Sequence, residues 1–192
     1  MAKAKNAERF RGANMHAAIM VMGVSGCGKS TVGAALAEAL GGVFLDGDDY
    51  HPQANVDHMA AGQPLTDAMR WPWLDRLANA VQGARAQATT VFACSALRKS
   101  YRNHLRAAIP ALQIVYLDVP YAVVAARLSA RKQHFMPASL LESQYATLEV
   151  PRNATVTVCA DQPVAGVLKP LLSALTAPCD TDSDDDAPQR AR

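Results

Sequence analysis

A glycine-rich segment near the start of the chain has the spacing of a phosphate-binding loop. The pattern G-x-x-x-x-G-K-[ST] matches Gly23-Val24-Ser25-Gly26-Cys27-Gly28-Lys29-Ser30-Thr31, between an apolar run and a helical pattern. Glycine lets backbone N–H groups converge on phosphate oxygens, and the N-terminus of the following helix adds unpaired donors with partial positive charge. We expect all nine residues to bind the phosphates of ATP, with Lys29 on the β- and γ-phosphates and the Ser30 hydroxyl on Mg²⁺.

Cys27 lies inside this loop, where the helix N-terminus could make a thiol reactive. The loop needs only the backbone N–H of that residue. We therefore interpret Cys27 as a small filler residue rather than as a redox centre.

A second cluster, Asp46-Gly47-Asp48-Asp49, ends the next apolar run. The carboxyl ends of parallel strands face the ligand crevice, so these carboxylates are expected beside the phosphate loop. One carboxylate can hold the water shell of Mg²⁺, and another can accept the proton of a substrate hydroxyl. We assign the base to Asp48 and the metal shell to Asp46, although the reverse also fits, as does a solvated turn.

The third apolar run ends in Cys94-Ser95-Ala96 and carries no carboxylate. Motor and switch NTPases place a second metal-binding Asp at such a position. The pattern therefore favours a small-metabolite kinase over those classes.

Short apolar runs alternate with helical patterns along the middle of the chain. This alternation predicts an α/β fold with parallel strands and helices on both faces of the sheet. The expected strands are His16–Met22, Val43–Leu45, Thr90–Ala93, Ile114–Leu117 and Thr155–Cys159. The expected helices are Lys29–Leu40, Ala54–Ala61, Trp73–Ala88, Lys99–Ala108, Tyr121–Lys132, Pro137–Thr147 and Val164–Leu175.

Composition limits the class of protein. The 192 residues are 50% hydrophobic and 19% charged, which fits a single globular domain at 15–177. A basic leader at 1–14 and an acidic tail at 178–192, both expected to be flexible, offset each other within the net charge of +2. The nearly neutral body argues against nucleic-acid binding. With no apolar run of membrane length, no secretory signal and four scattered cysteines, we expect a cytoplasmic protein without a membrane partner.

Together with further segments, these motifs make nearly all of residues 18–170 resemble the P-loop gluconokinases, within the shikimate-kinase-like group of small kinases. The specific segments are D-G-D-x-x-H-P, C-S-A-L-R and the stretch from His134 to Pro151. The matching stretches are MGVSGCGKST (22–31), FLDGDDYHPQANVDHMAAGQPLTDAMRWPWL (44–74), CSALRKSYRNHLR (94–106), YLDVP (116–120), ARKQHFMPASLLESQYATLEVP (130–151) and Asp161-Gln162-Pro163.

The resemblance implies a fold, a reaction and an assembly. The expected fold is a five-stranded parallel sheet in the order 2-3-1-4-5, with a mobile lid at about 127–150. The expected reaction transfers a phosphoryl group from ATP to D-gluconate, with Mg²⁺, giving 6-phosphogluconate. Relatives of this kind are often homodimers, so a homodimer is also expected.

The resemblance also assigns site residues. Arg70 lies where related kinases bind a substrate carboxylate, and Arg98 and Arg102 could add further cations. Many relatives have Lys in place of Arg98, whose planar fork suits a carboxylate. His51 could bond a substrate hydroxyl or hold its own loop. The lid residues Arg127 and Arg131 are expected to flank the adenine and to stabilise the transferring phosphoryl group, while Gln162 and Pro163 line the adenine pocket.

Two alternatives stay open at this point. The first is another small-metabolite kinase on the same scaffold, such as a shikimate, nucleotide or nucleoside kinase. The second is a non-catalytic nucleotide-binding regulator, which would need neither the base Asp48 nor lid arginines.

Overall fold

The computed structural model describes residues 15–130 and 138–176. The predicted leader at 1–14 and tail at 178–192 lie outside these ranges. Arg131 and the centre of the predicted lid, with His134 and Phe135, also lie outside them. The predictions made for those residues therefore stay predictions.

A five-stranded parallel sheet forms the middle layer, in the order β2-β3-β1-β4-β5. The predicted order is confirmed. Every neighbouring pair is parallel, so the carboxyl ends of all strands meet at one edge of the sheet. The strands are β1 Ala18–Met22, β2 Val43–Asp46, β3 Thr90–Ala93, β4 Gln113–Asp118 and β5 Val156–Cys159.

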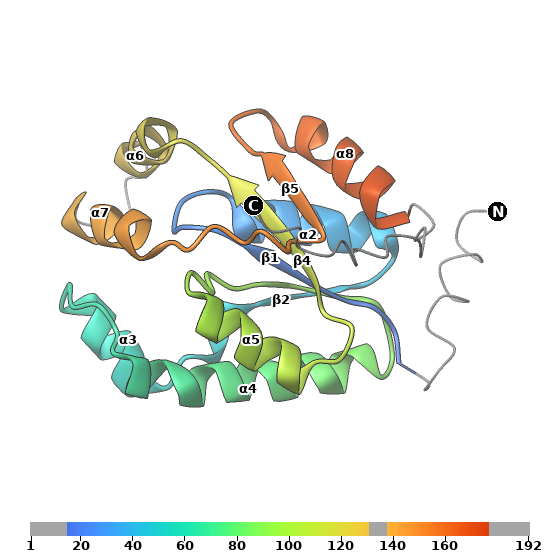
Figure 1. Cartoon of the computed structure of the whole chain (residues 1–192), viewed down its shortest axis with the longest axis horizontal. Coiled ribbons are helices and arrows are strands. Elements are labelled where there is room, and N and C mark those ends of the chain that lie inside the picture. The colour runs from blue at the N-terminus through green and yellow to red at the C-terminus, as the bar shows by residue number, and fades with distance from the viewer. Residues whose placement is uncertain (1–14, 131–137, 177–192) are drawn as a thin grey trace, which may run out of the picture.

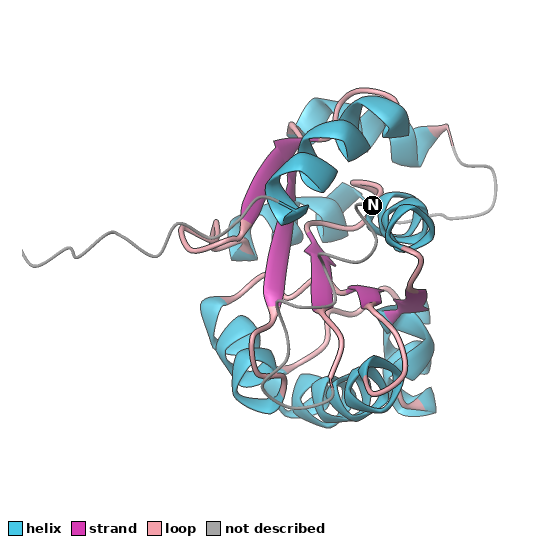
Figure 2. Cartoon of the chain, turned by 90° about the vertical axis from the view of Figure 1, so that its right-hand side faces the viewer, coloured by secondary structure: helices cyan, strands magenta, loops and turns pink. Residues whose placement is uncertain are grey.

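Helices cover both faces of this sheet, as Figures 1 and 2 show. In Figure 1, α4 and α5 lie below the strands and α2 and α8 lie above them, while α3, α6 and α7 gather at the left end. The helices are α2 Lys29–Leu40, α3 Gln53–Ala60, α4 Asp67–Arg85, α5 Lys99–Ala108, α6 Tyr121–Ser129, α7 Ala138–Thr147 and α8 Val164–Thr176, with a 3₁₀ turn η1 at Gly47–Tyr50.

The central strand β1 shows why two helical layers are needed. All five of its residues are buried, because successive side chains point to opposite faces. Ile19 and Val21 join the apolar core under α2 and α8, whereas Met20 and Met22 join the core under α4 and α5. Each face therefore has its own core, and the strand ends are held from both sides.

The main difference from the sequence prediction is the start of α4. The helix begins at Asp67 instead of Trp73 and includes Pro72. The side chain of Thr66 caps its N-terminus by accepting from the backbone N–H of Met69. The predicted start at Trp73 was too late because a proline is usually found in the first turn of a helix, whereas Pro72 lies in the second turn of α4. The extra turn carries Asp67 and Arg70 to the edge of the sheet.

Within the described part of the chain, no helix combines the length and the apolar character that crossing a bilayer requires.

Candidate active site

The phosphate-binding loop joins β1 to α2 at the carboxyl edge of the sheet. Gly23, Gly26 and Gly28 have φ values of 149°, 81° and 104°, which side chains disfavour. Gly28 directly precedes α2, and among the described residues no side chain caps this helix. Its first backbone amides are therefore available to an anion, as phosphate binding requires.

Neighbouring elements hold the loop in shape. Lys29 Nζ donates to the carbonyl of Val24 at 3.0 Å. Cys27 is 1% exposed, which agrees with its interpretation as a filler residue. On the outer side, Arg127 of α6 donates to the carbonyl of Cys27 at 3.2 Å and to that of Ala160 at 2.8 Å. Arg127 thus ties the phosphate loop to the end of β5, just before Gln162 and Pro163.

The second carboxylate cluster is a tight turn at the end of β2. Asp46 Oδ1 accepts from the backbone N–H of Asp48 at 3.1 Å. Gly47 is buried, and a Cβ added there would lie 2.2 Å from the carbonyl oxygen of Ala93. From the other side, Trp73 Nε1 donates to the carbonyl of Gly47 at 2.7 Å. The turn is clamped between β3 and α4, while the Asp48 side chain is 81% exposed.

Cys94 directly follows β3, at the position where a motor or switch NTPase would carry a second metal-binding carboxylate. Burial, together with the negative charge of Asp48, raises the pKa of its thiol to about 12. The thiol therefore stays protonated and adds no charge beside the turn.

His51 packs under the turn. Its ring stacks on Trp73 with 4.1 Å between centroids, and its Nδ1 lies 3.2 Å from Nδ2 of Asn55. Its Nε2 lies 4.0 Å from Asp48 Oδ1. Burial lowers the pKa of His51, and Arg70 adds to this effect while Asp48 opposes it. We conclude that the imidazole is neutral near pH 7.

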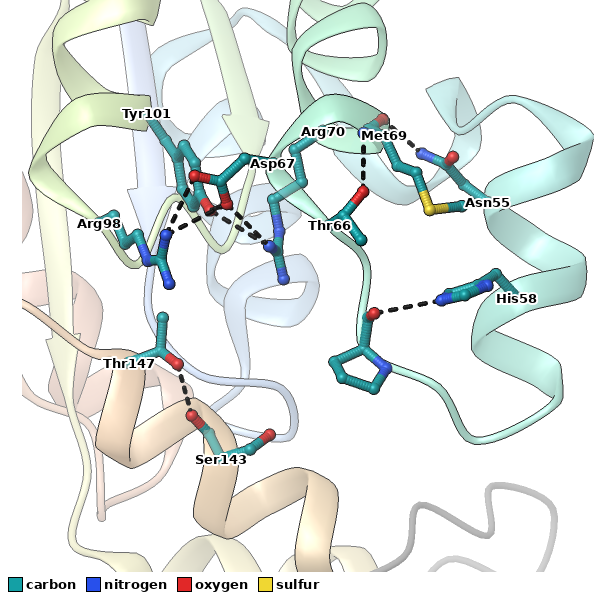
Figure 3. A network of polar contacts seen from close by, with 11 residues as sticks. Asn55, His58, Thr66, Asp67, Met69, Arg70, Arg98, Tyr101, Ser143 and Thr147 are labelled. Atoms are coloured by element: carbon teal, nitrogen blue, oxygen red, sulfur yellow. Dashed lines mark hydrogen bonds and ion pairs between the residues drawn. The ribbon is translucent and has the colours of Figure 1, made fainter.

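Two arginines converge on one carboxylate at the start of α4 and α5 (Figure 3). Arg98 Nη1 lies 3.0 and 3.1 Å from the two oxygens of Asp67, and Arg70 Nη1 lies 3.6 Å from Oδ1. Tyr101 donates its hydroxyl proton to Asp67 at 2.6 Å and accepts from Arg70 at 3.1 Å. We call Asp67, Arg70, Arg98 and Tyr101 the arginine cluster.

The arginine cluster keeps positive charge at an accessible surface. The side chains of Arg98 and Asp67 are 43% and 46% exposed. The hydrogen bond from Tyr101 and then the charge of Arg98 hold the pKa of Asp67 below its ordinary value. One anionic and two cationic groups leave a net positive charge, so the cluster can attract a further carboxylate.

Arg102 does not join this cluster. It is only 2% exposed, and its Nη1 donates to the carbonyls of Ala96 and Leu97 at 3.0 and 2.9 Å. Ala96 has a φ of 40°, a strained value for a residue with a side chain. Arg102 therefore stabilises the turn after β3, and its buried side chain is not part of the substrate site that we propose.

Sequence reasoning missed several residues that shape the site. Asp67 and Tyr101 complete the arginine cluster, and Asn55 contacts His51. Gln144 of α7 accepts from the backbone N–H of Ser25 in the phosphate loop at 2.7 Å, and Glu149 accepts from that of Lys99 at 2.5 Å. Both lie inside the stretch 130–151 that carried the family resemblance, which is the signal that could have found them.

The chain is similar in sequence and in overall fold to known proteins. A family model described as an AAA domain matches residues 19–151. The chain is 50% identical over 137 residues to a gluconokinase from Gluconobacter oxydans, covering 69% of this chain and 75% of that protein. It is 41% identical over 157 residues to the thermoresistant gluconokinase of Escherichia coli, covering 80% and 90%. The crystal structure of a gluconokinase from Sinorhizobium meliloti has a TM-score of 0.75 and 44% identity, covering 83% and 91%.

The clamp on the Gly47 turn gives a first prediction. Trp73→Phe keeps an aromatic ring on His51 but removes the N–H that bonds the buried carbonyl of Gly47. We expect the free energy of unfolding in urea to fall by about 1–3 kcal/mol, the cost of an unsatisfied buried acceptor. Trp71→Phe is the control, since that half-buried ring contacts Tyr101 and His104. An equal loss in both variants would contradict the clamp.

Proposed function

This chain belongs to the gluconokinase family, and from that premise we propose that it transfers the γ-phosphoryl group of ATP to D-gluconate, releasing 6-phosphogluconate and ADP. The enzyme is a P-loop kinase. One observation carries the assignment of its acceptor: the phosphate loop, an exposed carboxylate and a pair of arginines lie at the same edge of the sheet. A sugar acid presents hydroxyl groups and a carboxylate, which match the last two features.

For the nucleotide, we propose that the loop from Gly23 to Thr31 holds the phosphates through its backbone amides, with the amide of Ser25 exchanging its bond to Gln144 for a phosphate oxygen. Lys29 supports this assignment by lying at the start of α2, beside the uncapped helix end. We place the adenine between Arg127 and the segment Gln162-Pro163. Arg127 supports this placement because it donates to carbonyls of the phosphate loop and of Ala160, close to the segment that it would face across the adenine.

For the metal, we propose that the Ser30 hydroxyl and Asp46 hold Mg²⁺, directly or through water. Among the described residues, no cluster of three His, Cys, Asp or Glu side chains could hold a metal by itself. Oxygen donors from one hydroxyl and one carboxylate fit Mg²⁺, which keeps several waters and is usually completed by substrate phosphates. When bound, the ion neutralises phosphate charge during transfer.

For gluconate, we propose that Arg70 and Arg98 bind the carboxylate through the guanidinium N–H groups that Asp67 leaves free. His51 and Asp48 then face the hydroxyl that accepts the phosphoryl group. Asp48 accepts the proton of that hydroxyl as its oxygen attacks phosphorus. This task is modest, because phosphoryl transfer depends mainly on positioning and charge.

Three further features of the enzyme are proposed from its sequence. Arg131 is proposed to stabilise the transferring phosphoryl group, and it lies outside the described residues. A homodimer is expected from the family resemblance. We also infer a cytoplasmic location, where ATP is plentiful and buried thiols such as Cys94 stay reduced.

The acceptor can be tested directly. We expect ADP release with Mg-ATP to be fast with D-gluconate and slow with shikimate, glycerate, nucleoside monophosphates or no acceptor. Lys29→Ala should abolish turnover with every acceptor. Fast turnover with another acceptor would keep the phosphate site and overturn the substrate assignment. Nucleotide binding without turnover on any acceptor would instead favour the regulator.

The base assignment gives a second test. Asp48→Asn should lower kcat by about 100-fold, because an amide cannot accept the hydroxyl proton, while Mg-ATP binding stays unchanged. Asp49→Asn, at an exposed carboxylate in the same turn, is the matched control. Near-normal turnover of Asp48→Asn would remove Asp48 from the role. A markedly higher Mg²⁺ concentration for half-maximal activity in Asp48→Asn would reverse the two aspartate assignments.

The arginine cluster gives a third test, of how the substrate carboxylate is bound. Asp67→Asn removes the charge that orients Arg70 and Arg98, so we expect KM for gluconate to rise about tenfold with little change in kcat. Asp75→Asn, on the same helix and paired with His104, should leave KM unchanged. Because the pKa of Asp67 is lowered, its ion pair with Arg98 is fully formed at pH values above the ordinary pKa of an aspartate. The ion pair is lost as the pH falls through the lowered pKa of the folded protein. A fall in KM would show that Asp67 competes with the substrate carboxylate.

A further inference from the structure

A buried asparagine connects α3 to α4 beside the turn at Gly47–Tyr50. Asn55 is 3% exposed. Its Nδ2 donates to the backbone carbonyl of Met69 at 3.0 Å, as Figure 3 shows, and lies 3.2 Å from Nδ1 of His51. One amide nitrogen therefore serves two neighbours from different elements.

These contacts determine which nitrogen of His51 carries its proton. A backbone carbonyl can only accept a hydrogen bond, so the atom facing Met69 must be the amide nitrogen. The same nitrogen faces His51 Nδ1, which must then offer a lone pair. Because burial keeps the ring neutral, its single N–H lies on Nε2.

The Nε2–H group faces Asp48. The distance of 4.0 Å to Oδ1 is too long for a direct hydrogen bond. One hydroxyl oxygen about 2.8 Å from each atom would satisfy both, accepting from Nε2–H and donating to Oδ1. The stack on Trp73, which also bonds Gly47, fixes the imidazole and the turn relative to each other.

We propose that Asn55 is a positioning residue that acts through His51 to set the direction of the hydrogen bonds at the acceptor hydroxyl. The inference rests on the proposed function, since it concerns the hydroxyl of gluconate that is phosphorylated. The hydroxyl accepts from His51 and donates to Asp48, which leaves its other lone pair for phosphorus.

The phosphoryl transfer needs no proton from His51. The hydroxyl oxygen forms a bond to the γ-phosphorus while its proton passes to Asp48. The bond from the γ-phosphorus to the bridging oxygen breaks, and its electron pair leaves with ADP. His51 orients the hydroxyl throughout and keeps its own proton.

The tautomer can be read in the unaltered protein. In a two-dimensional ¹H–¹⁵N spectrum recorded through long-range couplings, we expect His51 Nε2 to be protonated and Nδ1 to be unprotonated near pH 7. Protonation at Nδ1 would overturn the inference whether or not any variant folds. A chain with the expected tautomer that fails to phosphorylate gluconate would refute the proposed function instead.

A double-mutant cycle tests the action through His51. Asn55→Asp replaces the donor by an acceptor and favours a proton on Nδ1, so we expect kcat to fall about tenfold while KM for ATP is unchanged. In the His51→Gln background the same change should cost less than about twofold, because no ring is left to misorient. Equal losses in both backgrounds would show that Asn55 only tethers α3 to α4. Asn79→Asp, at an exposed asparagine of α4, controls for the added charge.

Discussion

The contact that fixes the active site is the clamp on the backbone of Gly47. A Cβ added to Gly47 would lie 2.2 Å from the carbonyl oxygen of Ala93. On the opposite side, the indole N–H of Trp73 donates to the carbonyl of Gly47. The turn carries Asp46 and Asp48 on either side of Gly47, and His51 follows its last residue. Their positions relative to β3 and α4 therefore follow from backbone packing, and the phosphate loop faces them because the sheet is parallel.

Hydrogen-bond partners separate the arginines of the site into two groups. Arg102 is buried and Arg127 half-buried, and both donate to backbone carbonyls of the loops that they hold. Arg98 and Arg70 instead share a half-exposed carboxylate, so part of their hydrogen-bonding capacity is left for a ligand. Charge alone did not distinguish these groups, because a guanidinium satisfied by carbonyls is no longer available to a substrate.

Local sequence pattern was enough for the alternation of parallel strands and helices and for a glycine-rich loop between β1 and α2. The strand order came from the resemblance to the gluconokinases, because periodicity does not carry it. Long-range contacts were not accessible in that way. Asp67 meets Arg98 and Tyr101 across 31 and 34 residues of chain, and Asn55 meets Met69 across 14. The burial of Arg102 could not be read from the sequence for the same reason, since it depends on how α5 packs against the turn at Ala96.

The contrast between the clamped turn and the arginine cluster bears on how this enzyme can diverge. The carboxylates that we propose for catalysis flank Gly47, whose backbone is tightly packed, so almost any side chain introduced at position 47 would displace them. In the proposed function, recognition of the acceptor anion depends instead on the side chains of Asp67, Arg70, Arg98 and Tyr101. All four lie outside the two strands that frame the turn, on α4, on α5 or at the cap before α5. Mutation can therefore exchange the acceptor while the phosphoryl-transfer machinery is inherited intact, and laboratory evolution toward new sugar acids should begin at those four positions.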